Sequence, residues 1–244
     1  MSTPSPAGPS EAQSLHLRNS QQLVLTPPHG NRWVSIQVID GFIRLSAHHG
    51  DQIPETTLAL MSPMEGGGFL HPKTCNLQLE ALSETTLTIQ YGQELISQQD
   101  DFLTEWLMAL HVVRHPVKAE ERLFNLLKLL VYRLGRRTRE GCTLSFLLSH
   151  SRLAEIIGTT RSTVSRSMGK LRENGFISIE ESKGLLTIKD RTDNPIPTQQ
   201  AHHSRPQRHD QPFHFEHFDF LQPFFLRDKN ADRLRRPDFK ASAP

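Results

Sequence analysis

Residues 149–189 read SHSRLAEIIGTTRSTVSRSMGKLRENGFISIEESKGLLTIK, and this stretch is the most informative part of the sequence. Ser149 or Ser151 can cap a helix whose apolar residues recur at helical spacing. Gly158 ends that helix, because a tight turn between helices needs a residue that tolerates positive φ. Ala154 lies just before this turn, and so small a side chain lets a second helix approach closely. The stretch therefore begins with two packed helices.

The second helix follows the turn, and Thr159 or Thr160 can cap it. Its inner face is apolar and carries Val164, Met168 and Leu171. Its outer face is polar and basic, and carries Arg161, Ser162, Ser165, Arg166 and Lys170. After Asn174-Gly175 stops this helix, the runs FISIE and LLTIK form two short strands with a turn at 181–184. Two helices followed by such a hairpin make the winged helix-turn-helix pattern.

The outer face of the second helix has the chemistry of a DNA-reading surface. Arg161 and Arg166 lie in its N-terminal half, the part of a recognition helix that reaches base edges in the major groove. An arginine there can donate two hydrogen bonds to guanine, worth roughly 1–3 kcal/mol of discrimination. Thr163, Ser165 and Lys170 suit phosphate oxygens, which position the protein without reading sequence. The alternative interpretation is a winged helix that makes only protein contacts.

Short β-type runs precede this region, between about Leu23 and Ile96. WVSIQVI ends at Asp40-Gly41 and FIRLS follows directly, which is a strong hairpin signal. TLALM, LQLEAL and TLTIQY follow at even spacing, as in an antiparallel β-roll or barrel. The sequence therefore predicts an α+β fold that begins with an antiparallel β-roll.

Helical periodicity begins after residue 97. One apolar stripe consists of Leu103, Trp106, Leu107, Leu110 and Val113, in a helix that Pro116 ends. The wide apolar face of EERLFNLLKLLVYRLG predicts a second, buried helix that ends at Gly135. The expected organisation is a disordered N-terminus at 1–20, a β-roll effector-like domain at 21–97, a long helix at 98–116, a winged helix-turn-helix at 117–190 and a disordered tail at 191–244.

The tail contains two unusual features, which are five histidines and the aromatic run 213–226. The histidine spacing matches no fixed metal site, so we expect a solvated tail and no metal. The aromatic run can fold onto a partner such as RNA polymerase, or cover an apolar patch of its own chain. The sequence leaves these two alternatives open.

Charge is distributed unevenly along the chain. Residues 1–112 hold 4 Lys and Arg against 11 Asp and Glu, a net charge of −7. Residues 113–190 hold 15 against 8, a net charge of +7, and residues 191–244 hold 9 against 7, a net charge of +2. A basic second half indicates a polyanionic partner. The alternative is a chance asymmetry between two solvated surfaces.

Several function classes lack support in the sequence. The two cysteines, Cys75 and Cys142, cannot by themselves form a four-cysteine site, and we expect both to be buried and structural. No phosphate loop, nucleophile elbow or metal-ligand pair indicates an enzyme. No apolar run is long enough for a membrane span, and the N-terminus does not resemble a secretory signal, so we expect a cytoplasmic protein.

Residues 153–166, LAEIIGTTRSTVSR, and 171–177, LRENGFI, resemble the CRP/FNR superfamily of bacterial transcription regulators. The order of β-roll, long dimerisation helix and winged helix fits the same family, whose β-roll is of the cyclic-nucleotide-binding type. The resemblance implies a homodimer on a palindromic operator, with half-sites roughly 34 Å apart. The stripe from Leu103 to Val113 is then the candidate dimer seam, and the same helix can also pack against its own β-roll.

The resemblance also assigns site residues. Arginines matching Arg161 and Arg166 contact bases in the family, and Ser162 lies between them. Residues matching His150 and Ser151 lie near phosphates in the family. The full set expected at phosphates is Ser149, His150, Ser151, Thr160, Thr163, Ser165 and Lys170. Many members have glutamate in place of Ser162, so an altered base preference is expected, as in the nitrogen-control (NtcA-like) branch. Ser167 lies where an apolar core residue is usual.

Two cofactors of the family are not expected here. The runs at 65–68 and 71–74 are poor substitutes for its cyclic-nucleotide cassette, and the four cysteines of its iron–sulfur branch are absent. We therefore expect no cAMP and no cluster, while a different small effector, or none, stays open. The other function considered is a non-specific nucleic-acid or nucleoid-associated protein, which would use phosphate contacts only.

Overall fold

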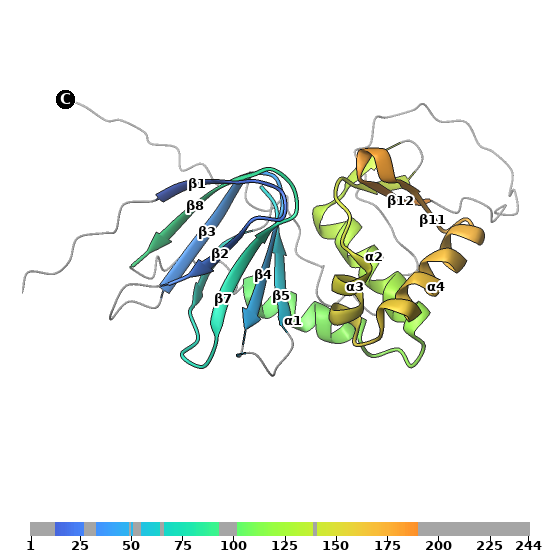
Figure 1. Ribbon diagram of the computed structural model, residues 1–244, viewed down its shortest axis with the longest axis horizontal. Helices are drawn as coiled ribbons and strands as arrows, with labels where there is room; N and C mark the ends of the chain where they lie inside the picture. The colour runs from blue at the N-terminus through green and yellow to red at the C-terminus, as the bar shows by residue number, and fades with distance from the viewer. Residues whose placement is uncertain are drawn as a thin grey trace, which may run out of the picture. The chain divides into compact units, whose positions relative to one another are not determined.

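The computed structural model describes residues 13–26, 33–48, 50, 55–63, 66–92, 102–138 and 141–189. Its first part is a β-roll of two four-stranded antiparallel sheets (Figure 1). One sheet has the order β1 (Gln13–Leu17), β8 (Thr85–Tyr91), β3 (Trp33–Asp40) and β6 (Gly67–Leu70). The other has the order β2 (Gln22–Leu25), β7 (Asn76–Ala81), β4 (Ile43–His48) and β5 (Thr56–Met61). This arrangement confirms the predicted fold class.

The core of the β-roll follows from strict alternation along the strands. In β3, Val34, Ile36 and Val38 are buried while the residues between them are more exposed. Successive side chains of a strand point to opposite faces, so one face of each strand enters the core. Strand β4 is different, because Arg44 and Ser46 on its other face are buried as well. Something outside the β-roll must therefore cover that face.

The turn at Asp40-Gly41 carries the chain from one sheet to the other. Strands β3 and β4 lie in different sheets, so the predicted hairpin was wrong. Gly41 has a φ of +87°, and a Cβ there would collide with the backbone oxygen of Glu84. The Phe42 N–H donates to the Ser83 hydroxyl at 3.1 Å, which fixes the corner. A local turn signal does not specify whether the next strand pairs with the preceding strand in the same sheet or joins the opposite sheet.

The N-terminal boundary also needs correction. Residues 13–17 form β1, which pairs antiparallel with β8 from Gln13–Ile89 to Leu17–Thr85. They lie inside the segment 1–20 that composition predicted to be disordered. Leu17 is buried, so this short edge strand contributes to the core, which the Ser and Pro content of the preceding residues concealed.

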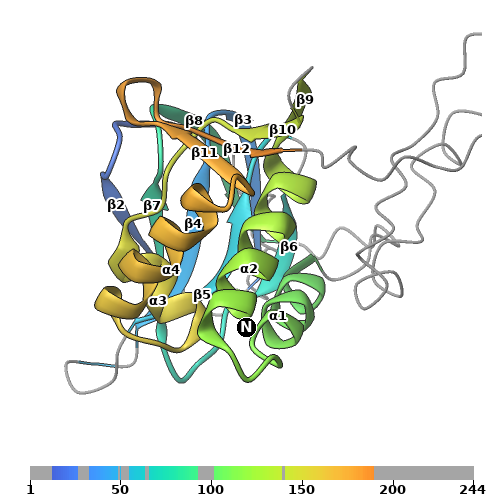
Figure 2. The same cartoon turned by 90° about the vertical axis from the view of Figure 1, so that its right-hand side faces the viewer.

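Two helices follow, α1 (Phe102–Val113) and α2 (Ala119–Leu134). Helix α1 packs on β5 and β6, and α2 packs against the helices that come after it (Figure 2). At 12 residues α1 is about 18 Å long and shorter than the 16-residue α2. Neither these helices nor the others in the described ranges are long and apolar enough to cross a membrane.

The last part is a three-helix unit with a small sheet. Helices α3 (His150–Ile157) and α4 (Arg161–Glu173) pack on each other and on α2. The sheet has the order β11 (Ile177–Glu180), β12 (Leu185–Lys189), β10 (Gly141–Leu144) and β9 (Arg136–Thr138), and a short 3-10 turn, η1 (Glu181–Lys183), joins β11 to β12. The wing is as predicted, whereas β9 and β10 were not foreseen.

The predicted segments from 190 onward, including the histidines and the aromatic run, lie outside the described residues.

Candidate nucleic-acid interface

The turn between α3 and α4 has the geometry that the sequence predicted. Ser149 caps α3, and its hydroxyl accepts a hydrogen bond from the Arg152 N–H at 3.2 Å. Gly158 ends α3 in the left-handed region, with a φ of +64°. Thr160 caps α4 and accepts from the Thr163 N–H at 3.2 Å. Of the alternatives that the sequence left open, Ser149 and Thr160 are the caps.

The inner faces of the two helices form one apolar contact. Leu153, Ile156 and Ile157 of α3 are buried, as are Val164, Met168 and Leu171 of α4. Ala154 is buried, as a close approach of the helices requires. Ser167 is also buried, so a hydroxyl occupies the position where an apolar side chain is usual.

The outer face of α4 is exposed over its whole length. Its exposed side chains are Arg161, Ser162, Ser165, Arg166, Lys170, Arg172 and Glu173. Neither Arg161 nor Arg166 pairs with a carboxylate of the residues that the structure describes, whereas Lys170 lies 3.4 Å from the Glu120 carboxylate on α2. Two guanidinium groups are therefore available on the N-terminal half of the helix.

Five of the seven residues assigned to phosphates lie at the N-termini of the two helices, and Ser165 and Lys170 lie farther along α4. Ser149, Ser151 and Thr160 are exposed, and His150 and Thr163 are half-buried. The Thr160 hydroxyl is 2.9 Å from that of Thr163 and 3.0 Å from that of Ser162, so these three groups also hold the start of α4. Ser149, His150, Ser151 and Arg161 line one pocket, so the start of α3 lies close to the start of α4. The contacts of all these residues with bases and phosphates remain predictions.

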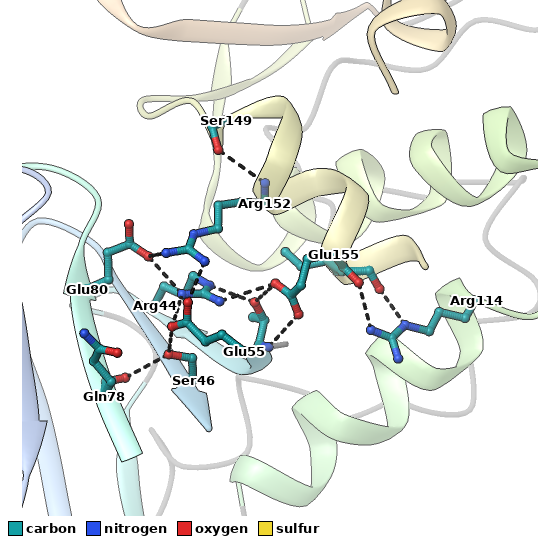
Figure 3. Close-up of polar contacts among 11 residues, drawn as sticks. Arg44, Ser46, Glu55, Gln78, Glu80, Arg114, Ser149, Arg152 and Glu155 are labelled. Carbon is teal, nitrogen blue, oxygen red and sulfur yellow. Dashed lines mark hydrogen bonds and ion pairs between the residues drawn. The ribbon is translucent and has the colours of Figure 1, made fainter. Parts of the chain in front are cut away.

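A charged network that the sequence did not reveal joins α3 to the β-roll (Figure 3). Arg44 of β4 is 0% exposed. Its guanidinium donates to Thr57 at 2.7 Å, Glu55 at 2.8 Å, Glu80 at 2.9 Å and Glu155 at 3.3 Å. The first three partners belong to the β-roll, and Glu155 lies on α3. Helix α3 therefore covers the face of β4 that carries Arg44.

A second arginine completes the network from the side of α3. Arg152 donates to Glu55 at 2.6 Å and pairs with Glu80 at 3.1 Å. Burial by itself raises the pKa of the Glu55 carboxyl, but hydrogen bonds from Ser46, Arg44 and Arg152 outweigh it and lower the pKa to about 2. Glu55 is therefore ionised whenever the network is formed near neutral pH.

Two further arginines hold the C-terminal end of α3. Arg114, just after α1, donates to the carbonyl oxygens of Ile156 at 2.5 Å and Glu155 at 3.2 Å. Arg122 of α2 donates to the carbonyl oxygen of Ile157 at 3.0 Å. The last carbonyls of a helix have no partner within it, and cations are favourable at that end. Charged groups from outside the helix pair therefore hold α3 along its length.

Comparison with known proteins identifies the second half of the chain. Residues 121–193 match the Crp-like helix-turn-helix domain. This match covers under a third of the chain and shows which kind of DNA-binding domain these residues resemble. A global nitrogen regulator of Synechococcus elongatus is 30% identical over 112 residues, which are 46% of this chain and 42% of that protein. A probable transcriptional activator of Rhizobium leguminosarum is 27% identical over 134 residues, 55% of this chain and 53% of that protein. The chain thus spans about half the length of these relatives.

Solved structures of two bacterial proteins share the fold. FixK2 from Bradyrhizobium japonicum superposes with a TM-score of 0.56 at 17% identity, covering 74% of this chain and 93% of that one. The c-di-GMP responsive regulator CLP from Xanthomonas campestris gives a TM-score of 0.53 at 15% identity, covering 73% and 94%. The two curated relatives carry the names of a global nitrogen regulator and of a probable transcriptional activator.

The residues of the predicted dimer seam divide between two faces of α1. Trp106, Leu110 and Val113 are buried inside the chain, which contradicts their assignment to a surface for a partner. Arg133 of α2 lies 4.3 Å from the centre of the Trp106 ring and covers it. Leu103 is half-buried, and Leu107 is exposed. The apolar stripe is wider than one seam, and its larger part packs on the chain's own strands and on α2.

Neither cysteine is fully buried, contrary to the prediction. Cys75 and Cys142 are both half-buried and reduced, and desolvation raises the pKa of the Cys75 thiol. Within the described residues, no three His, Cys, Asp or Glu side chains gather into a metal site. Glu65 lies outside these residues, so the expectation about cyclic nucleotides stays a prediction.

Proposed function

We propose that this chain is a sequence-specific DNA-binding transcription regulator that reads base edges with the exposed face of α4. The observation that supports this most strongly is the pair Arg161 and Arg166. Both guanidinium groups are exposed in the N-terminal half of a helix whose opposite face is packed and whose start is capped. Such a helix can enter the major groove, where an arginine pairs with guanine O6 and N7.

The surrounding charges support a nucleic-acid partner. Arg161, Arg166, Lys170 and Arg172 lie on α4 with a single acidic residue, Glu173. Exposed Arg136 and Arg137 add to the positive charge of the same domain. Basic side chains on phosphates provide affinity and orientation but no sequence information. Sequence selectivity in this proposal therefore rests on Arg161, Ser162 and Arg166.

We further propose that the chain acts in the cytoplasm as a homodimer on a palindrome, with half-sites about one helical turn, roughly 34 Å, apart. Leu107 and Met108 are adjacent and 42% and 44% exposed on α1, which offers an apolar surface to a second copy. Leu107→Glu should give the mass of a monomer in light scattering. A dimer that persists in this variant would place the seam elsewhere.

Selection of bound duplexes from a random library, at near-physiological salt, tests the central proposal. We expect an enriched palindrome, and a loss of about 10- to 100-fold in affinity for it in Arg166→Ala. Arg172→Ala is the matched control, since it removes an exposed arginine from the C-terminal end of the same helix. It should weaken binding to all sequences by a smaller and uniform factor. Equal binding to scrambled duplexes at fixed salt would favour the non-specific alternative instead.

A further inference from the structure

The feature that carries a further inference is the burial of Arg44 between two parts of the chain. Arg44 and Glu80 are directly opposite each other on neighbouring strands β4 and β7. With Glu55 and Thr57, the β-roll already supplies three of the partners of this guanidinium. A buried charge is retained only when it is paired and hydrogen-bonded, and here the fourth partner, Glu155, comes from the helix-turn-helix.

The Glu155 carboxylate makes hydrogen bonds to the β-roll in addition to its ion pair with Arg44. One carboxylate oxygen accepts from the Thr57 N–H at 2.8 Å. The other accepts from the Thr57 hydroxyl at 2.7 Å and from Arg44 at 3.3 Å. Three donors in fixed positions therefore determine where this carboxylate lies.

Two side chains of α3 that face the β-roll carry opposite charges. Arg152 and Glu155 are three residues apart, so they lie on one face of α3. Arg152 contacts carboxylates, and Glu155 contacts the guanidinium and Thr57. Rotation of α3 by one residue would move both side chains away from their partners. The network thus sets the direction in which α3, and α4 packed on it, faces.

The network leaves the proposed reading surface open. Arg161, Ser162 and Arg166 on α4 are exposed while Glu155 and Arg152 are engaged. Contact with the β-roll therefore orients the helix-turn-helix and does not cover its DNA-reading face.

We propose that Arg44 is a positioning residue for DNA recognition. Through Glu155 and Arg152 it fixes the direction of α4 relative to the β-roll, and thereby the separation of the two recognition helices in a dimer. This inference rests on the proposed function. A single half-site needs only one recognition helix, whereas a palindrome needs two at the correct separation. Release of the network should therefore weaken palindrome binding and leave half-site binding unchanged.

Glu155→Ala in the full-length chain is the variant that tests this. Without Glu155 the network keeps Arg44 of the β-roll and Arg152 of α3 against two glutamates, so no uncompensated charge is left buried. Glu121→Ala is the matched control, because it removes an exposed glutamate of α2 that, within the described residues, pairs with exposed Lys118 alone. Arg44→Lys keeps the positive charge but lacks the planar guanidinium group. Its affinity for the palindrome should lie between those of the wild type and Glu155→Ala.

Affinity is measured for a duplex with one half-site and for palindromes with a series of half-site spacings. In Glu155→Ala we expect half-site affinity within about twofold of the wild type, at least about a tenfold loss on the preferred palindrome, and a broader spacing preference. Light scattering should give an unchanged mass. An unchanged ratio of palindrome to half-site affinity, or a monomeric variant, would overturn the positioning role. A wild type without sequence-dependent binding to either duplex would overturn the proposed function, and this role with it.

Discussion

Helix α3 has two neighbours that hold it by opposite kinds of interaction. Toward α4 it presents Ile156 and other buried apolar side chains. Toward the β-roll it presents Arg152 and Glu155, which enter hydrogen bonds and ion pairs. Apolar burial is non-directional and scales with area, whereas hydrogen-bonded charges depend on geometry and on ionisation. The apolar side therefore makes the helix pair one unit, and the charged side determines how that unit faces.

The largest expected effect on the free energy of unfolding comes from removing Arg44, the buried cation on the charged side of α3. Among the residues that the structure describes, Arg44→Met leaves Glu55 and Glu80 paired with Arg152 alone and Glu155 without an ion pair. Breaking a buried pair in this way typically costs about 3–5 kcal/mol, and we expect a loss of that order in the free energy of unfolding by urea. Arg136→Met, at an exposed position, is the control and should change it by less than about 0.5 kcal/mol. A loss no larger than the control's would mean that the network does not stabilise the fold.

A similar or smaller loss in the free energy of unfolding is expected from a change on the apolar side of α3. Ile156→Ala removes a buried side chain from the contact of α3 with its neighbours. Such truncations cost about 2–5 kcal/mol, from lost transfer free energy and the cavity that remains. Calorimetry should show this loss to be nearly independent of pH, since no charge is involved. Ile39→Ala, in an exposed side chain of β3, should have little effect. A pH-dependent loss in Ile156→Ala would show that the two sides of α3 are coupled.

The charged side alone should respond to acid. The pKa of Glu55 is about 2 in the folded chain, below the usual 4.3 or so of an unfolded glutamate. Its stabilising contribution is therefore complete above about pH 4.5 and is lost as the pH falls toward 2. Unfolding free energies measured from pH 6 to pH 3 should fall more steeply in the wild type than in Glu55→Gln. Parallel curves would contradict the depressed pKa.

The smallest effect is expected where a charge pair is exposed. Glu120 and Lys170 join α2 to α4 at 3.4 Å, with side chains 38% and 56% exposed. Exposed pairs contribute about 0–1 kcal/mol and are screened by salt. Glu120→Gln should therefore change the melting temperature by little, and not at all at high salt. A large effect would show that exposure is a poor guide to the strength of these ion pairs.

Local signals in the sequence were sufficient for the helix-turn-helix and its wing. Ser149, Gly158 and Thr160 act within three or four residues of their own positions, so their capping roles can be predicted without knowing the rest of the fold. Alternation along β3 identified a strand with one buried face for the same reason. Three predictions failed because they needed distant partners: the hairpin at Asp40-Gly41, disorder at 13–17, and an intermolecular seam that included Trp106.

By itself the sequence determined the kinds of element, their caps and the basic outer face of α4, because these depend on neighbours along the chain. Only the tertiary structure decided which sheet each strand joined and which apolar side chains of α1 were left for a partner. It also decided that Arg44 would be paired with Glu155, 111 positions away. From sequence alone, a charged residue in a strand is predicted to be exposed. Whether another element covers it depends on residues far away in the sequence, which no local pattern identifies.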